Sequence, residues 1–436
     1  MSSGVPAIPV WNLPWRAGLA YGLLGLPLAF AALPLYVVLP HHYASNLGLP
    51  LATVGGLLML VRLIDAGIEP LLGRFSDLLY RRTAHRVLSV VGIAAVLLGS
   101  GMGGLFFPRV EGPTALAAWM VAGLLFTCLA HSLLVIAHQA WGVRLGGDAV
   151  QRSRIVAWRE GAGLFGVITA SALSVAWGAD IMLTVFALAL LAGWWALWLA
   201  PRPIFTVAPI TGRKTWEPRL WQPLAEPQFR RLLGVFSCNG IASAIPAALM
   251  LFFAQDRLQA TQPQIALFLV LYFVSGALSM PAWVRAVRRF GLERTWLAGM
   301  LLAVACFGWA AVLEGGQVAA FGLICVLSGT ALGADLAVPG ALLAMLIERH
   351  GAQGVRDGAY LGWWNLATKL NLAIAAGATL PLLQWLGYMP GSQDPQALQH
   401  LAWTYALLPC ALKLIAAWML HRLLISPRNL TQGVTS

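Results

Sequence analysis

Long apolar segments separated by short polar ones run through almost the whole chain. Residues 17–39 and 87–107 contain no charged side chain, and residues 157–177 contain only two. About 20 apolar residues suffice to cross a bilayer as a helix, which satisfies its own backbone groups in lipid. The pattern predicts twelve spans at about 17–39, 50–72, 87–107, 115–140, 157–178, 181–201, 231–254, 263–285, 295–314, 318–347, 360–388 and 399–424.

One longer polar stretch with several prolines divides these spans into six and six. We predict an N-terminal six-helix bundle at residues 1–201, a cytoplasmic linker at 202–230 and a C-terminal six-helix bundle at 231–436. The predicted fold class is therefore an all-α membrane protein with twelve transmembrane helices in two bundles. This plan is similar to that of the major facilitator transporters, whose halves rock around a central site.

Composition narrows the function classes further. The chain is 59% hydrophobic and 10% charged, whereas soluble domains carry about 25% charged residues. Soluble enzymes, secreted disulfide scaffolds, collagens and disordered proteins are thereby excluded. The net charge of +12 comes from short clusters rather than a continuous stripe, so no nucleic-acid partner is expected. No hydrolase triad, phosphate loop or Cys/His metal motif is present, so we predict neither an enzyme nor a cofactor.

Loop charge predicts the orientation. Basic residues gather in alternate loops, and the opposite loops contain only Arg109 and Arg257. Because cytoplasmic loops are enriched in Lys and Arg, both termini and the linker are predicted to be cytoplasmic. Abundant Ala, Leu, Gly and Arg favours a GC-rich bacterial genome, and hence a multi-pass protein of the bacterial cytoplasmic (inner) membrane. Membrane lipid is the expected surrounding partner, and twelve spans suffice for a monomer.

Span two contains three ionisable residues on one helical face, Arg62, Asp65 and Glu69. Ionisable residues within spans are energetically costly and usually mark function. Two carboxylates one turn apart suit a small hard cation such as sodium, and they could equally share a proton. The alternative is an Arg62–Asp65 pair that only joins helices, with Glu69 near a gate.

Span eleven contains Lys369, one of only three lysines against 25 arginines. This side chain lies too deep to reach the interface easily, and Asn365 precedes it by one turn. Lys369 could meet Asp65 across the two halves and sense the cation. It could instead pair with a backbone carbonyl or with Asp335 of span ten.

The segment after span two predicts a cytoplasmic gate formed by Gly73, Asp77 and Arg81. Asp77 can cap the start of a neighbouring helix and pair with arginines of the facing half. That contact would hold one conformation closed at the cytoplasmic end.

A small-molecule substrate is expected in the cavity between the halves. Trp364 could line this cavity or belong to the interfacial belt, and we also assign Tyr360 to it. His138 could transfer protons, contact substrate or only pack. Arg159 and Glu160 open the predicted span five, where an anchoring pair and a site pair are both open readings.

Two motifs resemble those of the glycoside–pentoside–hexuronide:cation symporters, the melibiose-permease-like family. Residues 62–73, from Arg62 through Asp65 and Pro70 to Gly73, are similar to the family's span-two signature. Residues 356–364, with Lys369 five residues on, are similar to its Arg-x-Gly-x-Tyr-x-Gly-x-Trp run. The resemblance spans essentially the whole chain.

This resemblance implies roles for individual residues. Asp65 and Glu69 would take the positions of the cation-binding carboxylates, and Ser132 that of a hydroxyl ligand in span four. Lys369 would match the lysine near that site, and Arg159 an arginine near the sugar site. Glu69 replaces the usual aspartate, which leaves the choice between sodium and proton open.

The family's sugar-binding acids have no counterpart, because Pro27-Leu28 and Val135 stand near those positions. We therefore predict a cation- or proton-coupled symporter of a small organic solute that works by alternating access. A sugar remains one candidate solute. The alternatives are a lysolipid or amphipathic-solute transporter, and a transporter-like sensor that binds without moving its ligand.

Overall fold

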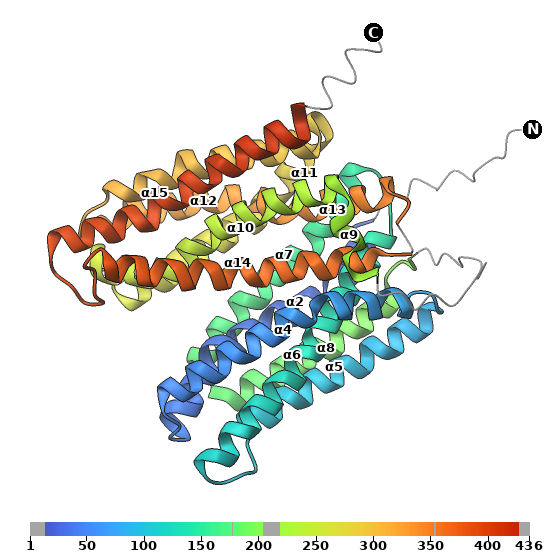
Figure 1. Cartoon of the computed structure of the whole chain (residues 1–436), viewed down its shortest axis with the longest axis horizontal. Coiled ribbons are helices and arrows are strands. Elements are labelled where there is room, and N and C mark those ends of the chain that lie inside the picture. Colours follow the sequence, from blue (N-terminus) through green and yellow to red (C-terminus); the bar gives the residue numbers. More distant parts are fainter. Residues whose placement is uncertain (1–13, 177, 204–218, 353–354, 427–436) are drawn as a thin grey trace, which may run out of the picture.

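The computed structural model describes residues 14–176, 178–203, 219–352 and 355–426, and helices dominate these ranges. Figure 1 shows two groups of helices, α1–α8 and α10–α15, which lean together at one end and diverge toward the other. Most of the predicted linker, residues 204–218, lies outside the described residues. Its described C-terminal part forms a single 3-10 turn and the short helix α9, and α10 begins at Pro227.

The helices of the first group are α1 (Trp15–Gly22), α2 (Gly25–Phe30), α3 (Leu39–His41), α4 (Leu51–Leu79), α5 (Ala84–Phe106), α6 (Pro113–Arg144), α7 (Ala149–Ala176) and α8 (Gly178–Leu199). Those that follow are α9 (Gln222–Ala225), α10 (Pro227–Phe252), α11 (Gln262–Phe307), α12 (Val318–Ala337), α13 (Pro339–Arg349), α14 (Asp357–Trp385) and α15 (Pro395–Leu420). Apart from the short linker helix α9, they form the twelve membrane-crossing segments of the predicted fold class.

Nine segments of the described chain are each long and apolar enough to cross a membrane. The other three are the first span and the charged helices α4 and α7. The first span is broken into α1, α2, a π-helical turn at Pro34–Val38 and α3. Prolines at positions 27, 34 and 40 remove backbone donors there, which explains why one continuous helix does not form.

Three of the predicted spans, eight, nine and ten, are bounded or broken at defined residues. Helix α11 includes the predicted spans eight and nine, and they turn at Gly291, whose φ of 78° lies in the region that favours glycine. Span ten is divided into α12 and α13 just before Pro339. Between spans eight and nine, Gly291 alone replaces the loop that was expected there.

The two groups meet chiefly where α4 packs along α14 and α7 along α11. Glycines allow the first contact: a Cβ on Gly73 would overlap the carbonyl oxygen of Gly358, and a Cβ on Gly358 would overlap that of Gly73. Small residues of this kind let helix backbones touch in membrane proteins. One turn further along, Gly362 lies against the backbone of Glu69.

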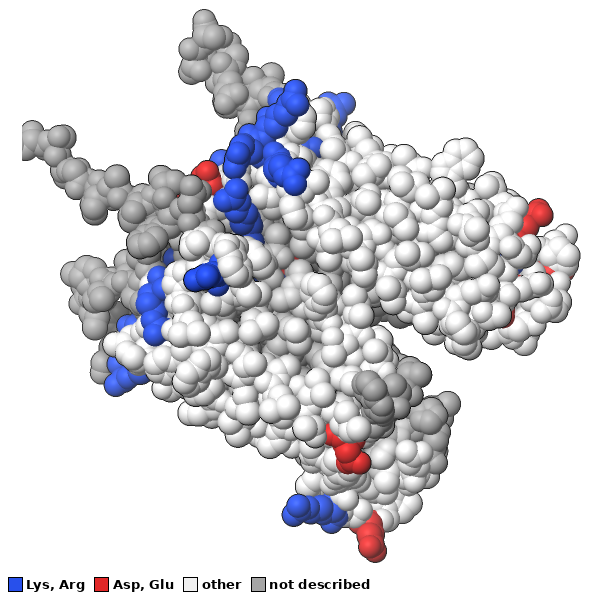
Figure 2. All heavy atoms as spheres, turned by 180° about the vertical axis from the view of Figure 1, so that it is seen from behind, with Lys and Arg blue, Asp and Glu red and all other residues white. Residues whose placement is uncertain are grey.

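Charge separates the two ends of the molecule. Figure 2 shows Lys and Arg gathered at one end, and a cleft between the two lobes that opens at the other. We call the first the basic end; its exposed arginines include Arg81, Arg82, Arg86, Arg285, Arg288 and Arg289. The helix groups are therefore closed against each other at the basic end and separated at the opposite end (Figure 1).

Candidate functional site

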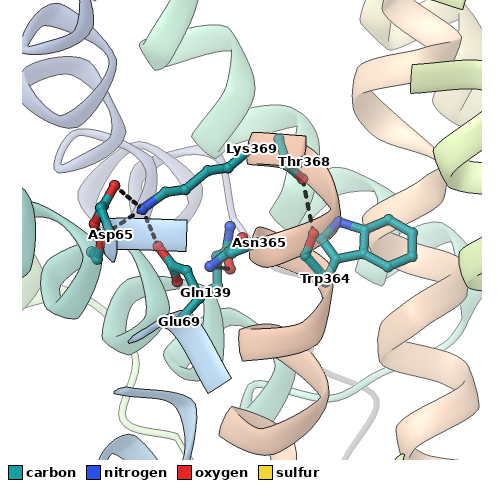
Figure 3. Close-up of polar contacts among 8 residues, drawn as sticks. Asp65, Glu69, Gln139, Trp364, Asn365, Thr368 and Lys369 are labelled. Atoms are coloured by element: carbon teal, nitrogen blue, oxygen red, sulfur yellow. Dashed lines mark hydrogen bonds and ion pairs between the residues drawn. The ribbon is translucent and has the colours of Figure 1, made fainter. Parts of the chain in front are cut away.

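A buried charged cluster joins α4 and α14 (Figure 3). The Nζ of Lys369 lies 2.5 Å from Oδ2 of Asp65 and forms a second ion pair with Oε1 of Glu69. It also donates to the Oγ of Ser132 on α6 over 2.9 Å, and Ser132 donates to Oδ1 of Asp65 over 3.1 Å. Asp65 and Glu69 are only 3% and 1% exposed, so both carboxylates are shielded from solvent, whereas the Lys369 side chain is 26% exposed.

The local sequence explains this arrangement. Asp65 and Glu69 are four residues apart on α4 and therefore project from one face, one turn apart. The glycine contacts between α4 and α14 bring the stem of Lys369 within reach of that face. Two carboxylates share one ammonium, so the ionised cluster keeps a formal charge of −1. Oε2 of Glu69 is buried and makes no hydrogen bond to a described residue.

The structure brings four of the five residues predicted for cation coupling into contact. The fifth, Arg62, is exposed on α4, three residues before Asp65. The alternative pairing of Lys369 with Asp335 is wrong, because Asp335 has a different partner. Its Oδ2 lies 2.6 Å from the Nζ of Lys413.

Sequence reasoning missed this second buried cluster, which lies within the second helix group. Lys413 of α15 also donates to Oδ1 of Asn239, over 2.8 Å. Oδ1 of Asp335 accepts from Asn239 and from the indole N–H of Trp296, over 3.2 and 2.9 Å. The scarcity of lysine was the available signal, since Lys413 also falls well inside a predicted span.

The predicted gate residue Asp77 caps a helix of the other group. Its two carboxylate oxygens accept from the backbone N–H groups of Gly358 and Ala359, over 2.7 and 3.1 Å. These N–H groups belong to the first turn of α14, where a negative charge is favourable. An arginine also joins the two groups here, but it comes from the same group as Asp77 and not from the facing half as expected: Nε of Arg144 lies 2.6 Å from Oδ2 of Asp357.

Of the other two predicted gate residues, one lies at the contact between the helix groups and the other lies at the surface. Gly73 is the close-contact glycine described above. Arg81 is exposed after the end of α4 and is not among the ion pairs of this interface. A further ion pair between the groups, absent from the prediction, joins Arg152 of α7 to Glu348 of α13 over 2.7 Å.

A cavity between α6, α7, α13 and α14 includes two of the predicted substrate residues, Arg159 and Trp364. Its polar lining comes from Tyr21, Gln139, Arg152 and Arg159. Arg159 pairs with the neighbouring Glu160 over 2.6 Å. This pair lies in the third turn of α7 rather than at its start, because the helix begins earlier than predicted, at Ala149.

Three predicted cavity residues lie elsewhere. Asn365 is buried one turn from Lys369 and donates to Oε1 of Gln139 over 3.1 Å. Tyr360 is buried against the ring of Phe229, and His138 is buried against Tyr21, to whose carbonyl its Nε2 lies at 2.8 Å. Tyr360 and His138 are not among the residues that line this cavity, because each packs against an aromatic ring of a neighbouring helix.

No group of three or more His, Cys, Asp or Glu side chains suited to a metal occurs in the described part of the chain. The oxygen set at Asp65, Glu69 and Ser132 is therefore the candidate for a cation. Its ligands are hard oxygens, which suit sodium or a proton rather than a transition metal.

Comparison with known proteins agrees with this architecture. The bacterial homologue of the iron transporter ferroportin, in its outward-facing state, is 15% identical and has a TM-score of 0.69, with 94% of this chain and 99% of that one covered. The Escherichia coli fucose:proton symporter gives 15% identity, the same coverage and a TM-score of 0.64. The proton:xylose symporter gives 17%, 94% of both chains and 0.63. These likenesses show the fold alone, and no curated protein sequence matches the chain.

The family is shown by sequence. The profile of the MFS/sugar transport protein family matches residues 18–426, which is nearly the whole chain. The structural neighbours named above are transporters. The chain therefore belongs to the MFS/sugar transport protein family of the major facilitator superfamily, and it is a multi-pass membrane transporter rather than an enzyme.

Proposed function

We propose that this transporter is a cation- or proton-coupled symporter that moves a small organic solute by alternating access. The observation that carries the proposal is the cluster in which Lys369 of one helix group contacts Asp65 and Glu69 of the other. The resemblance of its two motifs to the glycoside–pentoside–hexuronide:cation symporters agrees with this function.

The charge of the cluster gives a physical reason for coupling. Two carboxylates and one ammonium leave an excess negative charge in a buried site. In a low dielectric this excess is strongly unfavourable, so one sodium ion or one proton that neutralises it would bind favourably. Lys369 competes for the same oxygens as a tethered cation. The coupling ion would therefore change a contact that joins the two halves.

The gate contacts supply the second element of alternating access. We assign the basic end to the cytoplasm, because Lys and Arg are enriched in cytoplasmic loops. Asp77 then closes that side by capping α14, and the Arg144–Asp357 and Arg152–Glu348 ion pairs lie at the same end. The cleft in Figure 2 would open to the outside of a bacterial inner membrane.

A second candidate solute class is favoured by the chemistry of the cavity. A sugar is usually bound by carboxylates that accept hydrogen bonds from its hydroxyl groups. None of the residues lining the cavity described above is acidic. The lining instead combines arginines with Trp364, Leu361, Leu343 and Ile155. This combination favours an amphipathic solute, such as a lysolipid, over an uncharged sugar.

The test is a sodium and pH titration of the melting temperature of the purified protein. A ligand that binds only the folded state raises stability, by about 2.7 kcal/mol at a hundredfold excess over its Kd. We expect sodium, or acidic pH, to stabilise the wild type and to lose this effect in Asp65→Asn. Asp335→Asn is the matched control, because it also removes a buried acid beside a lysine and should keep the response.

An unchanged response in Asp65→Asn would contradict a coupling role for this cluster. Sodium-dependent stabilisation lost in that variant would identify sodium as the ion, and a shifted pH dependence without a sodium effect would identify the proton. A solute that binds the protein but does not cross the membrane of reconstituted vesicles would instead indicate a sensor.

A further inference from the structure

The cavity between α6, α7, α13 and α14 lies on the basic-end side of the Lys369 cluster. Trp364 and Leu361 line it, and they precede Lys369 by about one and a half and just over two turns along α14. Arg152, in the first turn of α7, lines the part nearest the basic end, and Arg159 lies two turns further along the same helix. Two guanidinium groups thus occupy one wall of the cavity.

Arg152 has an unused donor at this wall. Its side chain is only 2% exposed. Nε donates to the carbonyl of Gly147 over 2.8 Å and Nη2 to Glu348 over 2.7 Å, whereas the buried Nη1 makes no hydrogen bond to a described residue. A guanidinium stays charged and carries five N–H donors. A buried donor without an acceptor is unfavourable, and an oxyanion is the partner that the planar fork fits best.

Further donors surround the same space. Arg159 uses Nε and Nη2 on Glu160. Gln139 accepts from Asn365 with its Oε1, which leaves its own amide N–H groups as donors at the cavity wall. No acidic residue lines this cavity, and the remaining lining is apolar or aromatic.

We propose that this cavity binds the oxyanion of an anionic organic solute, a phosphate, sulfonate or carboxylate attached to an apolar or aromatic body. Nη1 of Arg152 accommodates the oxyanion together with Gln139 and Arg159, and the body packs against Trp364 and Leu343. The transport of such a solute rests on the proposed symport function. Its binding does not, since the cavity is separate from Asp65 and Glu69.

The position of Arg152 adds a mechanical consequence. Its partner Glu348 is 40% exposed and belongs to the other helix group, so this ion pair helps to hold the basic end closed. An oxyanion at Arg152 competes with Glu348 for the same guanidinium. Binding of the solute therefore weakens one of the contacts that must break when the cavity opens to the basic end.

The test compares two variants that remove the same ion pair from opposite sides. Binding of phenyl phosphate to the purified full chain is measured by calorimetry, with phenol as the uncharged control. Arg152→Gln should raise the Kd about tenfold or more, the size of a lost charged hydrogen bond. Glu348→Gln removes a competing anion and should lower the Kd roughly threefold, as expected for a half-exposed pair.

A third variant tests the location. A Cβ on Gly340 would lie 3.3 Å from both γ-carbons of Val156 and 3.8 Å from Nη2 of Arg159. Gly340→Ala narrows the cavity, so it should weaken phenyl phosphate more than inorganic phosphate. Equal effects on both ligands would contradict the assigned cavity.

A parallel arm distinguishes a free solute from a lipid headgroup. Nanodiscs of phosphatidylcholine with and without phosphatidylglycerol are compared by melting temperature. Stabilisation by phosphatidylglycerol that Arg152→Gln abolishes, without phenyl phosphate binding, supports the same site with a lipid ligand. The proposal is overturned if neither anion binds the wild type, or if both variants change the Kd in the same direction. Either result leaves the sodium and pH response at Asp65 as a separate question.

Discussion

The clusters around Lys369 and Lys413 use the same chemistry with different charge and different placement. Lys413 faces one carboxylate, Asp335, and the remaining oxygens of that carboxylate and of Asn239 are hydrogen-bonded. Lys369 faces two carboxylates, and one oxygen of Glu69 has no hydrogen-bond partner among the described residues. The Lys413 cluster is therefore neutral and lies inside one helix group, whereas the Lys369 cluster is negative and joins the two groups.

The difference teaches how a buried ion pair can be structural in one place and functional in another. A balanced pair within one rigid group has no reason to change during transport. An unbalanced pair between groups that must separate can respond to an added cation. The predictions below test this contrast.

The largest expected effect is on stability at the neutral cluster. Asp335→Asn leaves the ammonium of Lys413 without its buried counter-charge, and breaking a buried pair in this way costs about 3–5 kcal/mol. We expect a lower melting temperature at every sodium concentration. A sodium-dependent loss would mean that this cluster also binds the coupling ion, and the contrast would fail.

An intermediate effect is expected where the halves touch. In Gly73→Ala the new methyl group overlaps the backbone of Gly358, and overpacking of this kind typically costs about 1–3 kcal/mol. We expect α4 and α14 to separate, so that a thiol-reactive label modifies a cysteine introduced at the basic end more readily. Gly67→Ala on the same helix, where a Cβ meets nothing within 4 Å, is the control. Equal labelling of both variants would show that this contact does not close the basic end.

The smallest effect on stability is expected for Glu69→Gln. This change neutralises the excess charge and keeps the shape of the side chain, so stability should stay within about 1 kcal/mol of the wild type or rise. The response to sodium or acid should disappear, since Asp65 is balanced by Lys369 and no excess negative charge remains to be compensated. A loss as large as that of Asp335→Asn would show that both clusters are structural.

The helices and part of the site could be predicted from two properties of the sequence, the length of its apolar segments and the spacing of the charged residues within them. The twelve spans follow from hydrophobic length, and the spacing of Asp65 and Glu69 fixes their common face. The contact of Lys369 with Asp65 was one of several pairings left open. The position of a residue along a predicted span indicates its depth in the membrane, but it does not indicate which helices pack against that span. The resemblance to a known family also contributed Ser132.

Other features depend on which helices touch, and sequence periodicity does not contain this information. Pairing of Asp335 with Lys413 requires α12 and α15 to bring their side chains together. His138 and Tyr360 are polar residues in apolar spans, and their burial follows from the positions of Tyr21 and Phe229. The Arg152–Glu348 pair likewise joins residues that are 196 positions apart.

The cap that Asp77 provides for α14 has a consequence for biosynthesis. The first N–H groups of α14 have their acceptors on a helix that the ribosome makes some 280 residues earlier. Because domains fold in order as the chain emerges, the first half can wait in the bilayer with this carboxylate in place. The start of α14 then becomes fully satisfied only when the halves assemble, which links the completion of one helix to the correct pairing of both.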